Sequence, residues 1–286
     1  MSSRFEDGVD YSWLGDPINA RELFGTESQA LLELLRGLGS DEWGNLAVPG
    51  WSVHDLAVHV LGDYYGRLGG REPREGRQVR VFKAGETLEE FIHRSNQEWV
   101  DLNVDVSSAT IVEDLEVAGA QVARRFQEAD LQAASIGVSW AGVDPAPMWL
   151  DCAREFTEFW THRQQIRHAT GRETDLEPRA LFTVLDTFMR ALPHTLRDTI
   201  APIGTQMRMV VDGPGGGTWT ATATADRWSL APVPGGSLAA TVRLDAETAW
   251  RLCTRGIDPD TAIARARVHG DRRLAEAACQ IVSIVY

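Results

Sequence analysis

The spacing of apolar residues changes near Pro202, and this change constrains the fold more than any other feature of the chain. Before it, apolar residues recur three and four positions apart, as on one face of a helix; Ile111 and Leu115 are an example. After it, alternating or β-branched runs such as 206–211 and 238–244 are separated by turns rich in Gly and Pro. The sequence therefore predicts a helical part followed by a part that contains a sheet.

We accordingly expect an α+β protein with two domains, an up-and-down helical bundle over residues 1–200 and a small α+β domain over residues 201–286. The distribution of charge supports this boundary. The first 200 residues carry 19 basic and 33 acidic side chains, whereas the remainder carries nine arginines and eight acidic groups. A chain of 286 residues is also long for a single hydrophobic core.

Capping and stop signals define the expected elements. Ser52 with Asp55, and Thr87 with Glu90, form capping boxes at two helix starts. Residues 1–17 are expected to be irregular. The expected helices cover 18–38, 52–68, 87–99, 107–129, 147–170 and 178–197, with a bend at Pro193, and then 246–254 and a last helix from 270. The expected strands cover 206–211, 218–224, 228–230, 238–244 and 264–268, and the Gly-rich stretch 213–217 is interpreted as a hairpin turn.

Composition argues against several classes of partner. The net charge of −13 repels phosphate backbones and anionic membranes, so we expect neither nucleic acid nor a membrane as a partner. The N-terminus has no signal-peptide pattern, and no apolar run approaches the length needed to cross a bilayer. The three cysteines form no CxxC pair and are interpreted as buried residues in a reducing cytoplasm.

Glu158 and His162 lie four residues apart in a long predicted helix, so they share a face. Such pairs are frequent on protein surfaces. His59 adds to the argument because it lies two turns into another predicted helix with apolar neighbours Leu56 and Val60, although a lone core histidine is more often a packing residue. Two histidines and one carboxylate in one bundle match the ligand count of a catalytic metal site.

Two sequence motifs carry a resemblance to a known family. The stretch Pro49-Gly-Trp-Ser-Val-His-Asp-Leu-Ala-Val-His59 is similar to a signature of DinB-like bundle proteins, and more narrowly of the mycothiol-dependent maleylpyruvate isomerase family. Glu158-x-x-x-His162, followed by Gln165 and Gly171, resembles the second metal motif of that family. Segments 245–255 and 268–275 resemble its C-terminal domain.

The resemblance implies a DinB-like metal-binding four-helix bundle followed by a sterol-carrier-like α+β domain. It implies a divalent metal, most often zinc, held by His59, Glu158 and His162. It also implies mycothiol or a similar thiol as cosubstrate, and an enzyme in which a metal-bound thiolate adds to an electrophilic small molecule, as in cis-trans isomerisation of maleylpyruvate. Gln165 stands where the family motif has Asp, which puts the orientation of the ligands in question. We expect a monomer or a homodimer.

Further residues have weaker assignments. Arg255 matches an arginine of the family's C-terminal domain, which suggests a catalytic role, but Thr254 replaces the usual Gly, and a surface arginine at a helix end is an equal alternative. The basic loop 71–83 could attract an anionic substrate or be an ordinary solvated loop. His54 and His168 are expected at the surface. Trp51 is expected to be a packing anchor and Trp160 a core or interface residue.

Several functions remain compatible with the sequence. If the thiol adduct is kept, the same site would serve a mycothiol S-transferase in detoxification or natural-product biosynthesis. The α+β domain could instead bind an apolar ligand without catalysis. Two histidines and a carboxylate also suit an iron enzyme that uses oxygen.

Overall fold

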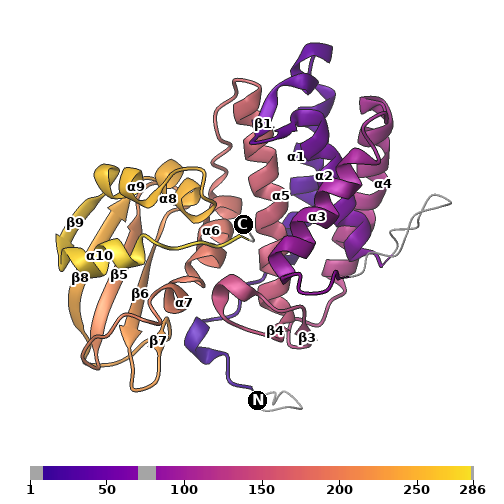
Figure 1. Ribbon diagram of the computed structural model, residues 1–286. Coiled ribbons are helices and arrows are strands. Elements are labelled where there is room, and N and C mark those ends of the chain that lie inside the picture. The colour runs from indigo at the N-terminus through magenta and orange to yellow at the C-terminus, as the bar shows by residue number, and fades with distance from the viewer. Residues whose placement is uncertain (1–8, 70–81, 285–286) are drawn as a thin grey trace. The chain divides into compact units, whose positions relative to one another are not determined.

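The computed structural model describes residues 9–69 and 82–284 (Figure 1). The chain forms two compact units, each built from separate stretches. The helical unit comprises Arg21–Ala129 and Glu158–Asp175, and the mixed unit comprises Met1–Ala20, Asp130–Thr157 and Leu176–Val285. These compact units divide the chain at points other than residue 200. They are not a test of folding domains, and the predicted domain boundary near residue 200 stays a prediction. The α+β class is confirmed, since helices and a five-stranded sheet are both present.

The helical unit consists mainly of long helices. These are α1 (Phe24–Arg36), α2 (Val53–Arg67), α3 (Leu88–Asp101), α4 (Ser108–Gln127) and the part of α5 (Met148–Ala169) from Glu158 onward. Two short 3-10 turns, η2 (Arg21–Leu23) and η3 (Ser40–Gly44), and the strand pair β1 (Leu46–Val48) and β2 (Trp51–Ser52) complete it. Helices α2 to α5 begin close to their predicted starts, whereas α1 begins later than predicted.

Both predicted capping boxes are confirmed. The Ser52 hydroxyl accepts the backbone N–H of Asp55 at 3.2 Å, and the Asp55 carboxylate accepts the backbone N–H of Ser52 at 2.9 Å. Thr87 and Glu90 make the same reciprocal pair at the start of α3. These contacts satisfy amide groups that have no partner within the helix, so they fix where α2 and α3 begin.

Helix α4 packs against both α1 and α2, and α3 packs against α2. A close approach falls at Gly119 of α4, where a Cβ atom would lie 2.4 Å from the Ser28 hydroxyl of α1. The absence of a side chain at Gly119 therefore allows α1 and α4 to approach closely. The core between the helices is built from apolar side chains that are at most 2% exposed: Leu31, Leu35, Leu56, Tyr64, Ile111, Leu115, Phe126 and Phe159.

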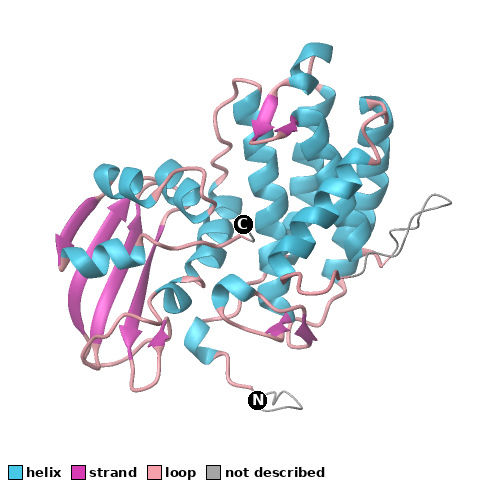
Figure 2. Ribbon diagram, in the orientation of Figure 1, coloured by secondary structure: helices cyan, strands magenta, loops and turns pink. Residues whose placement is uncertain are grey.

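The mixed unit combines a sheet with short helices (Figure 2). Its early elements are η1 (Ser12–Leu14), β3 (Ala134–Ser135), η4 (Ser139–Ala141), β4 (Ala146–Pro147), the start of α5, α6 (Pro178–Met189) and α7 (Leu192–Thr195). Then follow β5 (Thr205–Val211), β6 (Gly217–Ala223), β7 (Trp228–Ser229), β8 (Ser237–Leu244), α8 (Ala246–Cys253), α9 (Pro259–Arg265), β9 (Arg267–Gly270) and α10 (Arg272–Ala278).

The sheet has the strand order β7-β6-β5-β8-β9, in which β5 and β8 are parallel and the other neighbours are antiparallel. Strands β5 and β6 pair up to Val211 and Gly217, so the Gly-rich stretch between them is the predicted hairpin turn. Helix α10 packs on β5, β8 and β9, and α6 packs on β6. The more specific likeness to a sterol-carrier domain stays a prediction.

Two predicted elements of this unit need correction. The predicted helix 178–197 is interrupted between Met189 and Leu192, close to the bend expected at Pro193. Helix α9 occupies part of the predicted strand 264–268, which starts only at Arg267. The signal for α9 was present, because Asp258 caps it with its side chain and Pro259 occupies the first turn, where proline is favoured.

Residues 1–8 of the predicted irregular lead-in lie outside the described part, and residues 9–17 are more ordered than predicted. Leu14 is fully buried, its carbonyl accepts a hydrogen bond from the Arg190 guanidinium, and the carbonyl of Trp13 accepts the backbone N–H of Leu230 at 2.7 Å. The segment is thus an integral part of the mixed unit. Among the described residues, no helix is long and apolar enough to cross a bilayer.

Candidate metal centre

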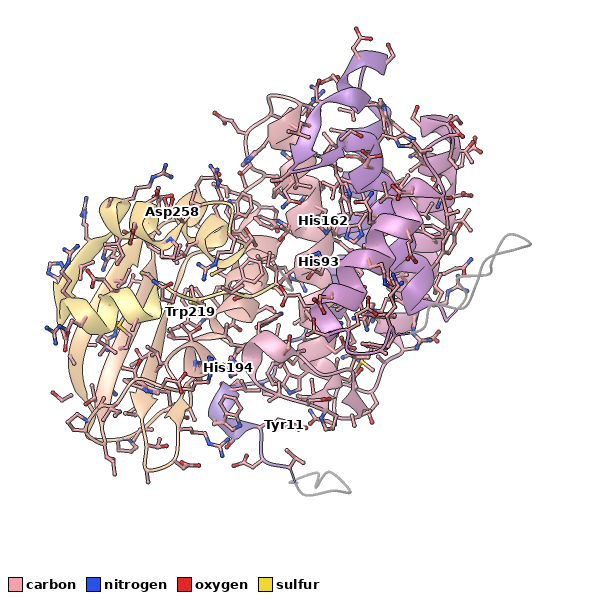
Figure 3. The ribbon with its side chains drawn as sticks, viewed as in Figure 1. Tyr11, His93, His162, His194, Trp219 and Asp258 are labelled. Carbon is pink, nitrogen blue, oxygen red and sulfur yellow. The ribbon has the colours of Figure 1, made fainter. Side chains whose placement is uncertain are left out.

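Helix α5 presents Glu158 and His162 one turn apart, as predicted from their spacing (His162 is labelled in Figure 3). A carboxylate oxygen of Glu158 lies 3.6 Å from Nε2 of His162, and both side chains are largely buried. The pair therefore faces the interior of the helical unit and not bulk solvent.

His59 of α2 meets this pair. Its Nε2 atom lies 3.2 Å from Nε2 of His162, and the two rings are nearly perpendicular with centroids 4.8 Å apart. The capping box at Ser52 sets the start of α2 and so places His59 two turns into the helix, on a face where its side chain is 8% exposed. The structure thus brings together all three predicted ligands from two helices.

Helices α2 and α5 run antiparallel where they meet. His59 contacts His162, and five residues further along α2 the ring of Tyr64 contacts Phe159, which precedes His162 on α5. Advancing along one helix therefore corresponds to going back along the other. Residues one turn after His59 come to the same level as Glu158, one turn before His162.

Asp63 occupies that position on α2, although it was not among the predicted ligands. Its carboxylate lies 3.2 Å from Nε2 of His59. One ligand atom each from His59, Asp63 and His162 lie within 4.8 Å of one another, and Glu158 is not part of this tightest cluster. The signal was present in the sequence, because Asp63 follows His59 by four residues just as Glu158 precedes His162 by four.

Gln165 orients His162. Its side-chain oxygen lies 2.8 Å from Nδ1 of His162 and accepts the N–H there, since an amide oxygen can only accept. The neutral ring then carries its lone pair on Nε2, which faces His59. The amide oxygen of Gln165 thus supplies the hydrogen-bond acceptor that the Asp of the resembling motif would provide, and the orientation of His162 is kept.

Trp51 lies beside the centre. Its ring centroid is 5.0 Å from that of His59, and its indole N–H donates to the side-chain oxygen of Gln97 on α3 at 2.9 Å. Trp51 is therefore a packing residue, as predicted, but it packs on a candidate ligand. Trp160 is fully buried, which confirms it as a core residue.

The mycothiol maleylpyruvate isomerase N-terminal domain is the family whose model matches residues 24–167, just over half of the chain. The chain belongs to this family. Two solved structures are also similar, the mycothiol-dependent maleylpyruvate isomerase at 14% identity and a mutant of it at 13%. Each alignment covers 88% of this chain and 91% of that chain with a TM-score of 0.47. No curated protein matches by sequence.

Membership of the maleylpyruvate isomerase family points to an enzyme of the isomerase class, and the matched region contains His59, Asp63, Glu158 and His162. These donors suit a divalent metal. In a tetrahedral centre with bonds of 2.0–2.1 Å, neighbouring ligand atoms are separated by about 3.3 Å. The separations of 3.2 Å between the two imidazoles and 3.2 Å from His59 to Asp63, and the 3.6 Å from His162 to Glu158, fit this geometry.

A buried ion pair fixes the turn of α5 that follows His162. The Arg163 guanidinium donates two hydrogen bonds to the Glu27 carboxylate of α1, at 2.5 and 2.9 Å, and a third to Asp175 at 2.8 Å. Arg163 and Glu27 are only 3% and 4% exposed. Burial raises the pKa of Glu27, and the adjacent guanidinium opposes that shift. Since breaking a buried ion pair is costly, the pair anchors this face of α5 to α1.

The remaining predicted residues lie elsewhere. Arg255 belongs to the mixed unit, where it follows α8 with a positive φ of 57° and donates to the Gln280 carbonyl at 2.9 Å. Its catalytic role stays a prediction. His168 is exposed as expected, whereas the expectation for His54 is wrong, because its ring is largely buried and pairs with the Val106 carbonyl. Of the loop 71–83, all but the last two residues lie outside the described part.

Proposed function

We propose that this protein is a metal- and thiol-dependent isomerase that converts maleylpyruvate, or a closely related cis-unsaturated acid, to its trans isomer with mycothiol as cosubstrate. The observation that carries the proposal is the 3.2 Å approach of two imidazole nitrogens beside carboxylates, inside the region that matches the family. The proposed metal ligands are His59, Glu158 and His162, with zinc as the expected ion. The proposed location is the cytoplasm, where low-molecular-weight thiols stay reduced.

A divalent cation held at these residues would supply chemistry that the side chains lack, by lowering the pKa of a coordinated thiol from its ordinary value of about 8.5. The chain's own residues prepare the site. Gln165 holds the Nδ1 proton of His162 so that Nε2 faces inward, and Trp51 packs against the ring of His59. Both imidazoles are thereby fixed before any ligand arrives, which reduces the ordering cost of binding.

The reacting sulfur is expected to come from a cosubstrate. All three cysteines are buried, and burial raises the pKa of Cys253 and of Cys279 to about 12. Thiols of this kind are inert as nucleophiles near neutral pH. This supports an external thiol such as mycothiol.

The chemistry balances without a redox partner. A thiolate sulfur forms a bond to one carbon of the cis double bond, and the π electrons move onto the conjugated carbonyl. Rotation about the resulting single bond is then free. Elimination breaks the carbon–sulfur bond, restores the double bond in trans geometry and returns the thiol unchanged. If the adduct were released instead, the reaction would be the S-transfer noted above.

The test combines metal content with product analysis on the full chain. The purified protein is expected to bind about one equivalent of zinc and to convert maleylpyruvate to the trans isomer only with both mycothiol and metal present. Mass spectrometry distinguishes the isomer, whose mass is unchanged, from a thiol adduct. His162→Ala should lose metal and turnover. The matched control is His168→Ala, because His168 is exposed on the same helix.

Two outcomes would refute the proposal. One is the same metal content in His162→Ala as in the unaltered protein. The other is that metal-loaded protein yields neither isomer nor adduct. If the iron-loaded protein then consumes oxygen, the alternative of an iron enzyme that uses oxygen is favoured.

A further inference from the structure

We propose that Asp63 is a ligand of the metal, so that the centre is formed by two imidazoles and two carboxylates, one of each from α2 and from α5. The inference rests on the proposed function, since it assumes that a divalent metal binds there. The inference goes beyond the proposed function by assigning a metal donor, Asp63, that the family resemblance did not indicate.

The distances to the imidazole nitrogens place Asp63 at least as well as Glu158 for binding a metal ion held by the histidines. The Asp63 oxygen lies 3.2 Å from Nε2 of His59, whereas the Glu158 oxygen lies 3.6 Å from Nε2 of His162. Asp63 also belongs to the set of ligand atoms that all lie within 4.8 Å of one another. The separations of 3.2 Å from His59 to Asp63 and 3.2 Å from His59 to His162 are short enough for one ion with bonds of about 2 Å to lie between those atoms.

The hydrogen-bonding capacity of these groups points to a cation. His162 directs its Nδ1 hydrogen to Gln165, so its neutral ring offers only a lone pair toward His59. Ionised Asp63 and Glu158 can only accept. When both rings are neutral, His59 brings at most one Nε2 hydrogen, yet that atom lies 3.2 Å from both the His162 nitrogen and the Asp63 oxygen. A divalent metal ion at this point would attract the lone pairs of all three atoms.

The local charge points the same way. The side chains of Asp63 and Glu158 are only 23% and 22% exposed, and they converge on the same level of antiparallel helices. Two ionised carboxylates at this level would attract a divalent cation. A divalent ion with two neutral imidazoles and two carboxylates gives a centre with no net charge.

The test measures metal binding and not turnover. Zinc affinity is determined by competition with a chromophoric chelator, and the coordination sphere is followed through the visible absorption bands of the cobalt-loaded protein. Asp63→Asn is expected to weaken zinc binding by about 100-fold or more, beyond the usual effect of residues that only support a ligand. The cobalt bands should shift in position and intensity. Asp63→His, which restores a donor, should recover much of the affinity.

The matched control is Glu113→Gln, which removes an exposed carboxylate from α4 of the same unit. This variant should change neither the zinc affinity nor the cobalt absorption bands. Circular dichroism of the metal-free variants checks that they fold. Unaltered zinc affinity in Asp63→Asn would overturn the assignment and leave the proposed function standing. A weaker affinity with unchanged cobalt bands would also overturn it, because Asp63 would then act from outside the coordination sphere. If the unaltered protein binds no zinc or cobalt, both proposals fail.

Discussion

At the residue scale, the orientation of the His162 imidazole depends on the side-chain amide of Gln165. Gln165 stands where the resembling motif carries Asp, and a change from carboxylate to amide removes a charge while keeping an acceptor oxygen. The contact of 2.8 Å to Nδ1 of His162 shows that this oxygen still receives the ring hydrogen. An amide accepts this hydrogen without the negative charge by which a carboxylate partner raises the basicity of a ligating imidazole.

Gln165→Ala should therefore weaken zinc binding by about 10- to 100-fold, since the ring of His162 would lose its orienting partner. Gln165→Asp should bind zinc at least as tightly as the unaltered protein. Zinc competition titrations measure both effects. Gln29→Ala, which removes an exposed glutamine from α1, serves as the control. Equal affinity in Gln165→Ala and the control would show that the contact has no part in holding the metal.

At the element scale, the helices of the bundle approach each other where a glycine allows it. A Cβ atom on Gly62 of α2 would lie 2.6 Å from Nε1 of Trp99 on α3. That indole is buried and held in place by its hydrogen bond of 2.7 Å to the Val58 carbonyl. The ring cannot yield without losing that bond, so α3 packs where it does because residue 62 has no side chain.

Gly62→Ala should lower the free energy of unfolding by about 1–3 kcal/mol, the usual cost of overpacking. Gly25→Ala should instead raise the free energy of unfolding, by at most about 1 kcal/mol. Gly25 lies in α1, where an added methyl group would meet no neighbouring atom within 4 Å, and alanine is the better helix former. Urea unfolding of the two variants gives both values. A Gly62→Ala protein as stable as Gly25→Ala would contradict the packing argument.

At the scale of the whole molecule, the compact units are assembled from distant stretches of the chain. Among the described residues, the mixed unit takes 9–20, 130–157 with the start of α5, and 176–284. A cut at the predicted boundary near residue 200 would separate α6 from the strand β6 on which it packs. Removal of residues 201–286 would therefore leave part of this unit's apolar surface exposed, so single substitutions test the unit more cleanly.

Leu14 lies near the start of the chain but is fully buried. Leu14→Ala should therefore lower the stability of the mixed unit by about 2–5 kcal/mol, the usual range for truncating a buried leucine. Hydrogen exchange should become faster at the amides of β6 and β7. Ile203→Ala is the control, because Ile203 is 74% exposed in the same unit and its loss should change stability by less than about 0.5 kcal/mol. Unchanged exchange in Leu14→Ala would show that the N-terminal segment is not needed for the stability of this unit.

Local signals were enough for most of the secondary structure. Apolar spacing and the capping boxes predicted the long helices, and the alternation after Pro202 predicted the strands, because these patterns depend on residues only a few positions apart. The predicted metal ligands came from the spacing of Glu158 and His162 together with a family resemblance. The parallel pairing of β5 with β8 and the placement of the N-terminal segment were not predicted, since both depend on contacts between remote residues.

The amino-acid sequence by itself thus determined that His59 and Asp63 share one helical face and that Glu158 and His162 share another, because an α-helix repeats nearly every four residues. Only the tertiary structure decided that the two faces meet and that their helices run antiparallel there. That direction brings both carboxylates to the same level beside the imidazoles. The physical reason is that burial of Tyr64 and Phe159 against each other, a contact between residues far apart in the chain, sets the register of the two helices.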